Sequence, residues 1–192
     1  MSVEPIAGRA AAAPILGVAG WKKSGKTTLV VRLIAEFARR GLRVATVKHA
    51  HHAFQIDDAE TDSARHRHAG ASQVAIVSRA RWALVTELEA EPEPSLSEVI
   101  ARLDPCDLII VEGYKLTSIP KIETRRREAR GHEPLADADA NVIAIAADVP
   151  GEQPADHRSR PVFALDDAAG LADFVAATLG LQFRTDRNPP VR

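Results

Sequence analysis

Gly20-Trp21-Lys22-Lys23-Ser24-Gly25-Lys26-Thr27 satisfies the pattern G-x-x-x-x-G-K-S/T in full. The apolar run Ile15–Ala19 precedes it, as expected of a strand that is covered on both faces. After it, from Thr27 to Arg40, apolar residues recur at helical spacing, and Gly41 is a good helix end. A buried strand, a glycine-rich loop and a helix in this order predict a phosphate-binding loop.

Each part of this motif has a reason in phosphate chemistry. The glycines let the backbone wrap closely, so that successive N–H groups and the helix N-terminus point at the β-phosphate. Lys26 is predicted to bridge β- and γ-phosphate oxygens, and the Thr27 hydroxyl to ligate Mg²⁺. We expect nucleotide contacts along the whole loop, from Gly20, Trp21, Lys22, Lys23, Ser24, Gly25, Lys26, Thr27 and Thr28. The alternative is a glycine-rich turn with a lysine at the start of a helix.

The rest of the chain alternates between short apolar runs and segments of helical character. Predicted strands are Arg43–Val47, Val74–Val77, Ala83–Val85, Leu108–Val111, Val142–Ala147 and Pro161–Leu165. Predicted helices are 61–69, 95–103 and 168–179. The runs at 74–77 and 83–85 are interpreted as neighbouring strands, and 108–111 as a central strand. This alternation predicts an α/β fold, a three-layer sandwich with a mostly parallel sheet, of the P-loop NTPase class.

Length and composition indicate one ordinary folded domain. With 192 residues, 45% of them apolar and 27% charged, the chain buries roughly 70% of its unfolded surface and needs no disulfide or structural metal to fold. We place the domain at residues 15–182. A flexible segment, rich in Ala, Gly and Pro, is expected at 1–14, and a loose tail at 183–192.

Charge, cysteine content and hydropathy restrict the function. A net charge of −1 gives no general attraction for nucleic acid or for an anionic membrane. The single cysteine, Cys106, fits a reducing compartment, so we expect the protein in the cytoplasm. No apolar run reaches the roughly 18 residues of a membrane span, so no membrane segment is expected.

Two acidic residues are candidates for the metal that accompanies a bound triphosphate. Glu112 follows the apolar run Leu108–Val111, at the sheet edge where ligands of open α/β sheets bind. Asp62 begins a predicted helix and is a candidate second acid for Mg²⁺. The alternatives are a solvated acid at the end of a strand and an ordinary acid at the start of a helix.

A basic, histidine-rich loop follows the strand at 43–47. Lys48, His49, His51 and His52 are interpreted as contacts for an anion or for a partner's ligand, either the nucleotide or a second phosphorylated molecule. A metal site and a purely structural or exposed role remain as alternatives, since no cysteine accompanies the imidazoles.

The arginine cluster at 125–127 and Asp148 can each be interpreted either as part of a binding site or as ordinary surface residues. Arg125-Arg126-Arg127 is either a solvated basic loop or a phosphate-binding flap. Asp148 ends a late strand, where a carboxylate can accept hydrogen bonds from N1 and N2 of guanine, which adenine does not offer. That position indicates GTP, although the Asn-Lys-x-Asp guanine signature is absent and Asp148 is otherwise a strand-end acid before a turn.

Taken together, several short motifs resemble the MobB family of molybdopterin-guanine dinucleotide biosynthesis adaptor proteins over about residues 15 to 148. The narrowest of them are Val47-Lys48-His49-Ala50-His51-His52, Val111-Glu112-Gly113-Tyr114-Lys115 and Pro120-Lys121-Ile122-Glu123. Asp62-Ser63, His68-Ala69-Gly70-Ala71 and Arg81-Trp82-Ala83-Leu84 follow the same order. One departure is Trp21-Lys22-Lys23, where family members often have smaller or uncharged residues.

The resemblance implies a homodimeric GTP-binding protein of the dethiobiotin-synthetase-like branch of phosphate-loop proteins, with weak Mg²⁺-dependent GTP hydrolysis. It implies an adaptor that assists the guanylyltransferase MobA in converting molybdopterin cofactor to its guanine dinucleotide form, with molybdopterin itself as a further candidate ligand.

Two other functions fit parts of the sequence. An ATP-dependent ligase or kinase of the same branch would use the basic loops to bind a carboxylate or phosphorylated acceptor. A GTPase of the nickel-chaperone type would use the histidines, although cysteine pairs are absent from the sequence.

Overall fold

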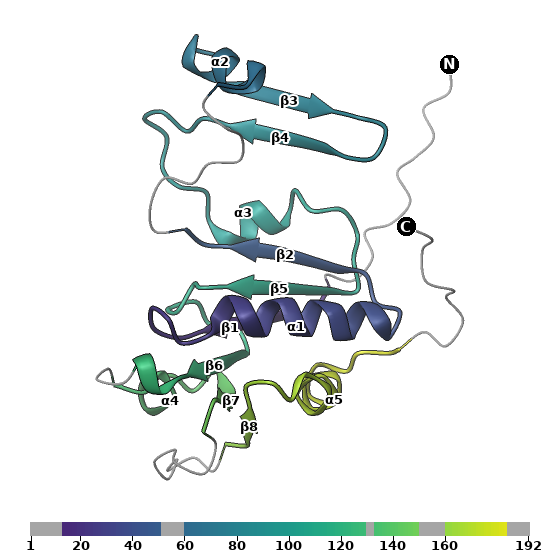
Figure 1. Ribbon diagram of the computed structural model, residues 1–192, viewed down its shortest axis with the longest axis vertical. Coiled ribbons are helices and arrows are strands. Elements are labelled where there is room, and N and C mark those ends of the chain that lie inside the picture. Colours follow the sequence, from purple (N-terminus) through teal and green to yellow (C-terminus); the bar gives the residue numbers. More distant parts are fainter. Residues whose placement is uncertain (1–12, 51–59, 130–132, 150–159, 184–192) are drawn as a thin grey trace. The chain divides into compact units, whose positions relative to one another are not determined.

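The computed structural model describes residues 13–50, 60–129, 133–149 and 160–183 (Figure 1). The chain forms two compact units, one of Met1–His49 with Leu103–Arg192 and one of Ala50–Arg102. The first unit contains the predicted phosphate-binding loop. The domain boundaries at residues 15 and 182 stay a prediction, and residues 1–12 and 184–192 of the expected flexible ends lie outside the described residues.

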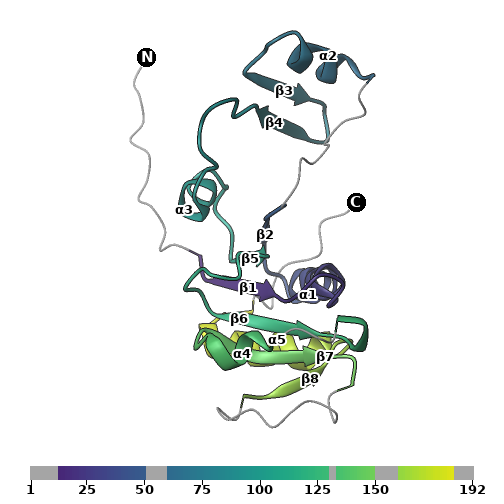
Figure 2. The same cartoon turned by 90° about the vertical axis from the view of Figure 1, so that its left-hand side faces the viewer.

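Six parallel strands form the sheet of the first unit, in the order β2-β5-β1-β6-β7-β8 (Figure 2). Their bounds are β1 Ile15–Ala19, β2 Val44–Lys48, β5 Leu108–Glu112, β6 Lys121–Arg125, β7 Val142–Ala147 and β8 Val162–Ala164. Because β5 and β1 have neighbours on both sides and cover on both faces, their apolar runs are buried almost throughout. The predicted parallel sheet is confirmed.

Helices cover both faces of this sheet. On one face, α1 (Lys26–Arg39) and α5 (Ala168–Leu179) pack against alternate residues of the strands. The resulting core contains Leu16, Val18, Leu29, Leu33, Phe37, Leu108, Ile110, Ile122, Leu171 and Val175. On the other face, Ala136 of the short helix α4 (Leu135–Ala138) packs with Val142, Ile145 and Ala147. The three-layer α/β sandwich is therefore confirmed.

The strand β6 was not predicted, because its sequence Lys-Ile-Glu-Thr-Arg is mostly polar. Lys121 and Glu123 are each only 1% exposed. The Lys121 ammonium donates hydrogen bonds to the carbonyls of Lys115 and Thr117 at 2.8 and 2.7 Å and to Asp139 at 2.6 Å. Glu123 accepts the backbone N–H groups that begin α4. Both buried charges are satisfied within the protein, so a central strand tolerates them.

Between β5 and β6 the chain crosses the sheet without a helix, and this crossing depends on Gly17 of β1. A Cβ at Gly17 would lie 2.8 Å from Cβ of Lys121 and 3.3 Å from Ile119. The Gly17 N–H instead donates to the carbonyl of Pro120 at 2.8 Å. The glycine therefore lets segment 113–120 pack directly against the strand that leads into the phosphate loop.

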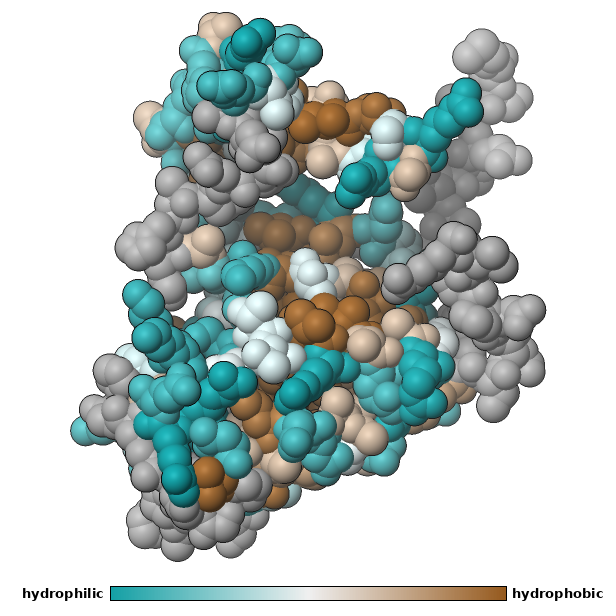
Figure 3. Space-filling view, viewed as in Figure 1, coloured by the Kyte–Doolittle hydropathy of each residue, from teal (hydrophilic) through white to brown (hydrophobic). Residues whose placement is uncertain are grey.

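The second unit contains α2 (Asp62–His68), an antiparallel hairpin of β3 (Gln73–Val77) and β4 (Trp82–Thr86), and α3 (Leu96–Ile100). These elements confirm the two predicted neighbouring strands and both helices. The Ser95 and Glu98 pair forms a reciprocal capping box at the start of α3. Hydrophobic surface is visible on this unit (Figure 3). In the hairpin, Val77, Trp82 and Leu84 are 75%, 67% and 50% exposed.

No helix in the described ranges has the length and apolar character needed to span a membrane.

Candidate functional site

Residues 20–25, the predicted phosphate loop, connect β1 to α1. Lys23 and Gly25 adopt positive φ angles of 65° and 97°, which bend the chain around the start of α1. Ser24 is buried, and its hydroxyl lies 2.6 Å from the hydroxyl of Thr124 on β6. The loop is therefore anchored to the sheet, and Gly25 is the N-cap of the helix.

Lys26 projects from the first turn of α1. Its ammonium donates a hydrogen bond to the carbonyl of Trp21 within the same loop, at 2.8 Å. Burial, together with the nearby charges of Lys115 and Lys48, lowers the pKa of Lys26, and the carboxylate of Glu112 opposes this effect. The crowding of positive charge would be relieved by a bound polyanion such as a triphosphate.

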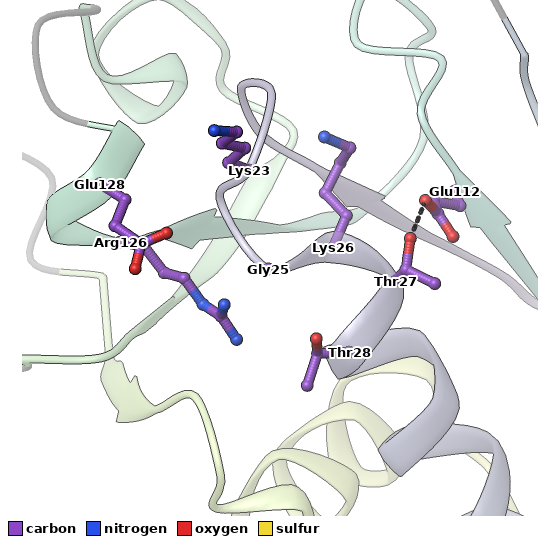
Figure 4. Close-up of a pocket in the computed structure, with 8 residues that line it drawn as sticks. All are labelled: Lys23, Gly25, Lys26, Thr27, Thr28, Glu112, Arg126 and Glu128. Atoms are coloured by element: carbon purple, nitrogen blue, oxygen red, sulfur yellow. Dashed lines mark hydrogen bonds between the residues drawn. The ribbon is translucent and has the colours of Figure 1, made fainter.

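Thr27 and Glu112 meet at the carboxyl end of β5. The Thr27 hydroxyl donates to Oε1 of Glu112 at 2.7 Å (Figure 4), and Glu112 is only 7% exposed. Mg²⁺ typically takes one or two protein ligands, with waters and phosphate oxygens completing its octahedron. A threonine hydroxyl and a carboxylate beside the phosphate loop fit this ion. The described residues include no group of three or more His, Cys, Asp or Glu side chains placed to bind a metal.

A pocket of about 320 Å³ opens beside these groups. Side chains from the loop, the start of α1, the end of β5 and the segment after β6 contribute to it (Figure 4). Its lining residues are Lys23, Gly25, Lys26, Thr27, Thr28, Glu112, Arg126 and Glu128. Six of these eight were predicted as nucleotide or metal contacts from the sequence, and the structure brings those six together around one cavity.

Lys48 is the last residue of β2 and His49 follows it, on the same edge of the sheet. The Lys48 ammonium lies 3.5 Å from Oε1 of Glu112, and its side chain is 61% exposed. The backbone N–H of His49 donates to the carbonyl of Glu112 at 3.0 Å. The His49 ring lies 4.8 Å from the ring of Tyr114. Both residues therefore border the Glu112 end of the site, whereas His51 and His52 lie outside the described residues.

Asp148 and Asp62 have different surroundings. Asp148 follows β7 as predicted, is exposed, and accepts the backbone N–H of Arg127 at 3.1 Å. Asp62 is the first residue of α2, with Thr61 as N-cap, and its exposed carboxylate lies 3.8 Å from Arg65. Asp62 belongs to the second unit. Their proposed roles, in guanine recognition and in metal binding, stay predictions.

Sequence reasoning missed Lys115 as part of the site. Its ammonium lies 3.8 Å from the centre of the Trp21 indole, a cation–π contact. The indole N–H of Trp21 also donates to the carbonyl of Glu133 at 3.0 Å. The buried Lys121 fixes the carbonyl of Lys115 itself. The signal was present in Glu112-Gly113-Tyr114-Lys115, where only the glutamate was assigned a role.

Sequence reasoning also left Arg126 within an undivided basic cluster. In the structure Arg125 is the last residue of β6 and its guanidinium donates to Glu123 at 2.8 Å. Arg127 begins the short 3₁₀ helix η1 (Arg127–Ala129). Only Arg126 of the three lines the pocket. The three arginines are adjacent and chemically alike, so the sequence does not show which of them lines the pocket. That depends on where β6 ends, at Arg125.

The chain is similar to a known protein family, to curated proteins and to solved structures. Residues 15–148 match the model of the family MobB, Molybdopterin guanine dinucleotide synthesis protein B. A molybdopterin-guanine dinucleotide biosynthesis adapter protein of Escherichia coli is 41% identical over 165 residues, which cover 84% of this chain and 91% of the relative. One of Haemophilus influenzae is 39% identical over 165 residues, covering 84% and 87%. The crystal structure of a MobB protein homolog from Bacillus stearothermophilus matches with a TM-score of 0.61 and 29% identity, covering 86% of this chain and 97% of that one.

Proposed function

The chain belongs to the MobB family of molybdopterin-guanine dinucleotide synthesis proteins, and on that premise we propose that it is a GTP-binding adaptor in this biosynthesis. It binds GTP with Mg²⁺ and assists a MobA-type guanylyltransferase in converting molybdopterin cofactor to its guanine dinucleotide form. The curated relatives from Escherichia coli and Haemophilus influenzae are adapter proteins of this pathway by name.

The hydrogen bond between Thr27 and Glu112 is the observation that carries the proposal. It places a hydroxyl and a carboxylate 2.7 Å apart, directly beside the lysine of a phosphate-binding loop. A P-loop NTPase needs this combination, because the metal is held between the loop threonine and an acid from a neighbouring strand while the lysine binds phosphate. The pocket of about 320 Å³ offers room for phosphate groups next to both.

Guanine is the base that the proposal assigns, and Asp148 is the residue proposed to recognise it. Its exposed carboxylate follows β7, at the same edge of the sheet as the phosphate loop. A carboxylate in this position accepts hydrogen bonds from N1 and N2 of guanine.

Hydrolysis of GTP is proposed to be slow, as suits an adaptor. The described residues that line the pocket include no glutamine to orient an attacking water. Without a water-orienting residue and an arginine at the γ-phosphate, phosphoryl transfer is slower by several orders of magnitude. The function therefore lies in delivering nucleotide, or in docking a cofactor intermediate, for the partner enzyme.

We further propose that the protein acts as a homodimer in the cytoplasm. The exposed apolar side chains of the β3–β4 hairpin support self-association, because exposed clusters of this kind mark interaction surfaces. The single cysteine fits a reducing compartment.

Titration of the purified chain with GTP and with ATP, each with and without Mg²⁺, tests the nucleotide assignment. The expected result is tight binding of GTP that weakens when Mg²⁺ is removed, and weaker binding of ATP. Addition of the GTP-loaded protein to a MobA-type enzyme should then raise its rate of guanylyl transfer. Preference for ATP would contradict the proposal and favour the ligase or kinase alternative.

A further inference from the structure

Arg126 is a cationic side chain that lines the pocket. Within the ranges that the structure describes, its guanidinium forms no hydrogen bond and no ion pair, although its neighbour Arg125 pairs with Glu123. Arginine that is held in a pocket next to a phosphate loop, with its N–H groups unused, is well suited to bind an anionic ligand.

The guanidinium of Arg126 lies directly against Gly25 of the loop. A Cβ built on Gly25 would be 2.8 Å from Nε of Arg126 and 3.3 Å from its Cζ. Gly25 therefore does more than allow a positive φ of 97°, because any side chain there would displace the guanidinium. The loop and the arginine fit one another closely.

The position of Arg126 indicates which end of a nucleotide it would meet. Figure 4 shows Arg126 extending toward Gly25 and Thr28, on the opposite side of Lys26 from Glu112. Glu112 and Thr27 mark the metal end, and the metal in phosphate-loop proteins bridges β- and γ-phosphate oxygens. The side away from the metal then receives the α-phosphate.

We propose that Arg126 binds the α-phosphate of the nucleotide through its forked N–H groups. This inference rests on the proposed GTP binding and adds a contact from the segment after β6. Glu128 also lines the pocket and is exposed. The negative charge of Glu128 repels a phosphate. Of the two pocket-lining residues after β6, Arg126 is therefore the one that attracts a phosphate.

Isothermal titration of the full-length chain, with Mg²⁺ present, tests the contact. The variants are Arg126→Gln, Arg126→Lys and the matched control Arg127→Gln, which removes the same charge one residue further on and outside the pocket. The probes are GTP, GDP and inorganic tripolyphosphate, the last of which has phosphates but no nucleoside. Circular dichroism verifies that each variant is folded.

Arg126→Gln is expected to weaken all three probes by about tenfold or more, the equivalent of about 1.4 kcal/mol. Arg126→Lys should give an intermediate loss, since it keeps the charge but not the fork, and Arg127→Gln should change affinity by less than about twofold. Equal losses in Arg126→Gln and in the control variant would overturn the contact, as would unchanged binding.

Two selective outcomes would also overturn the assignment. Loss of GTP affinity without loss of GDP affinity would place Arg126 at the γ-phosphate. Loss for both nucleotides without loss for tripolyphosphate would place it at the nucleoside. A wild-type chain that binds no guanine nucleotide would contradict the proposed function as a whole, and this inference with it.

Discussion

Lys26 has only one hydrogen bond from its ammonium among the described residues, to the carbonyl of Trp21, and that acceptor belongs to its own loop. The side chain therefore contributes little to the packing of the core and much to the charge of the pocket. We expect Lys26→Ala to lower GTP affinity by more than about a hundredfold, as loss of a charge contact to two phosphates implies. Titration calorimetry and thermal unfolding measure the two effects. A folded variant with unchanged affinity would remove the loop from the site.

Glu112 accepts a hydrogen bond from Thr27 and is also proposed to attract Mg²⁺, and one substitution distinguishes these two roles. In Glu112→Gln the amide oxygen still accepts the hydrogen bond from Thr27, but the charge that attracts Mg²⁺ is lost. We expect GTP affinity to fall by about tenfold or more with Mg²⁺ present and to change little in its absence. Titrations at several Mg²⁺ concentrations decide the point. An equal loss with and without Mg²⁺ would assign Glu112 to another role.

Among the elements, the contact between α1 and α5 includes a small ionic network beside its apolar core. Glu36 accepts hydrogen bonds from Arg39 at 2.9 and 2.7 Å and from Arg40 at 2.7 Å. Arg40 also reaches Asp173 and the carbonyl of Ala169 on α5. Hydrogen bonds from Arg39 and then from Arg40 lower the pKa of Glu36 from 4.5 to about 2.

The sign of this shift predicts how stability depends on pH. Because the carboxylate is favoured in the folded state, its contribution is complete above pH 4.5, the ordinary pKa of Glu36, and is lost as the pH falls toward about 2. Glu36→Gln is therefore expected to unfold at lower urea concentration than the wild type near neutral pH. The difference in midpoint should shrink between these two pH values and vanish below them. A difference that is independent of pH would show that the charge of Glu36 does not stabilise this contact.

The predicted and missed elements differ in one physical property. Strands with continuous apolar runs, such as Leu108–Val111, and the helix after the phosphate loop were predictable because burial follows their own periodicity. The strand β6 was not, because Lys121 and Glu123 are buried only through partners outside the strand, in segment 113–120 and in α4. Lys115 was missed, and Arg126 was not separated from Arg125 and Arg127, for the same reason. Their place beside the loop is set by tertiary packing, which local sequence does not encode.

At the scale of the whole molecule, the β3–β4 hairpin provides a test of self-association. The substitutions Val77→Lys and Trp82→Lys place two charges on its exposed apolar surface. If this surface forms the homodimer, the double variant should be monomeric in sedimentation velocity experiments, at concentrations where the wild type is dimeric. Val31→Lys is the matched control, since Val31 is 60% exposed on α1. A double variant that remains dimeric would place the interface elsewhere.

Contact with the partner enzyme can be tested separately from GTP binding at the Glu112 end of the site. Lys48 is 61% exposed, and its ammonium lies 3.5 Å from Oε1 of Glu112, the same oxygen that accepts the hydrogen bond from Thr27. Replacing the side chains of Lys48 and His49 changes no residue of the phosphate loop. It removes the cation and the imidazole at the Glu112 end of the site, where we expect an anionic pterin ligand or the partner to approach. We expect Lys48→Ala with His49→Ala to reduce stimulation of guanylyl transfer by roughly tenfold, as loss of a charge-assisted contact implies, and GTP affinity by much less. Arg43→Ala, just before the opposite end of the same strand, is the control for loss of an exposed cation beside β2. A proportional fall in both quantities would mean that Lys48 and His49 serve the nucleotide site alone.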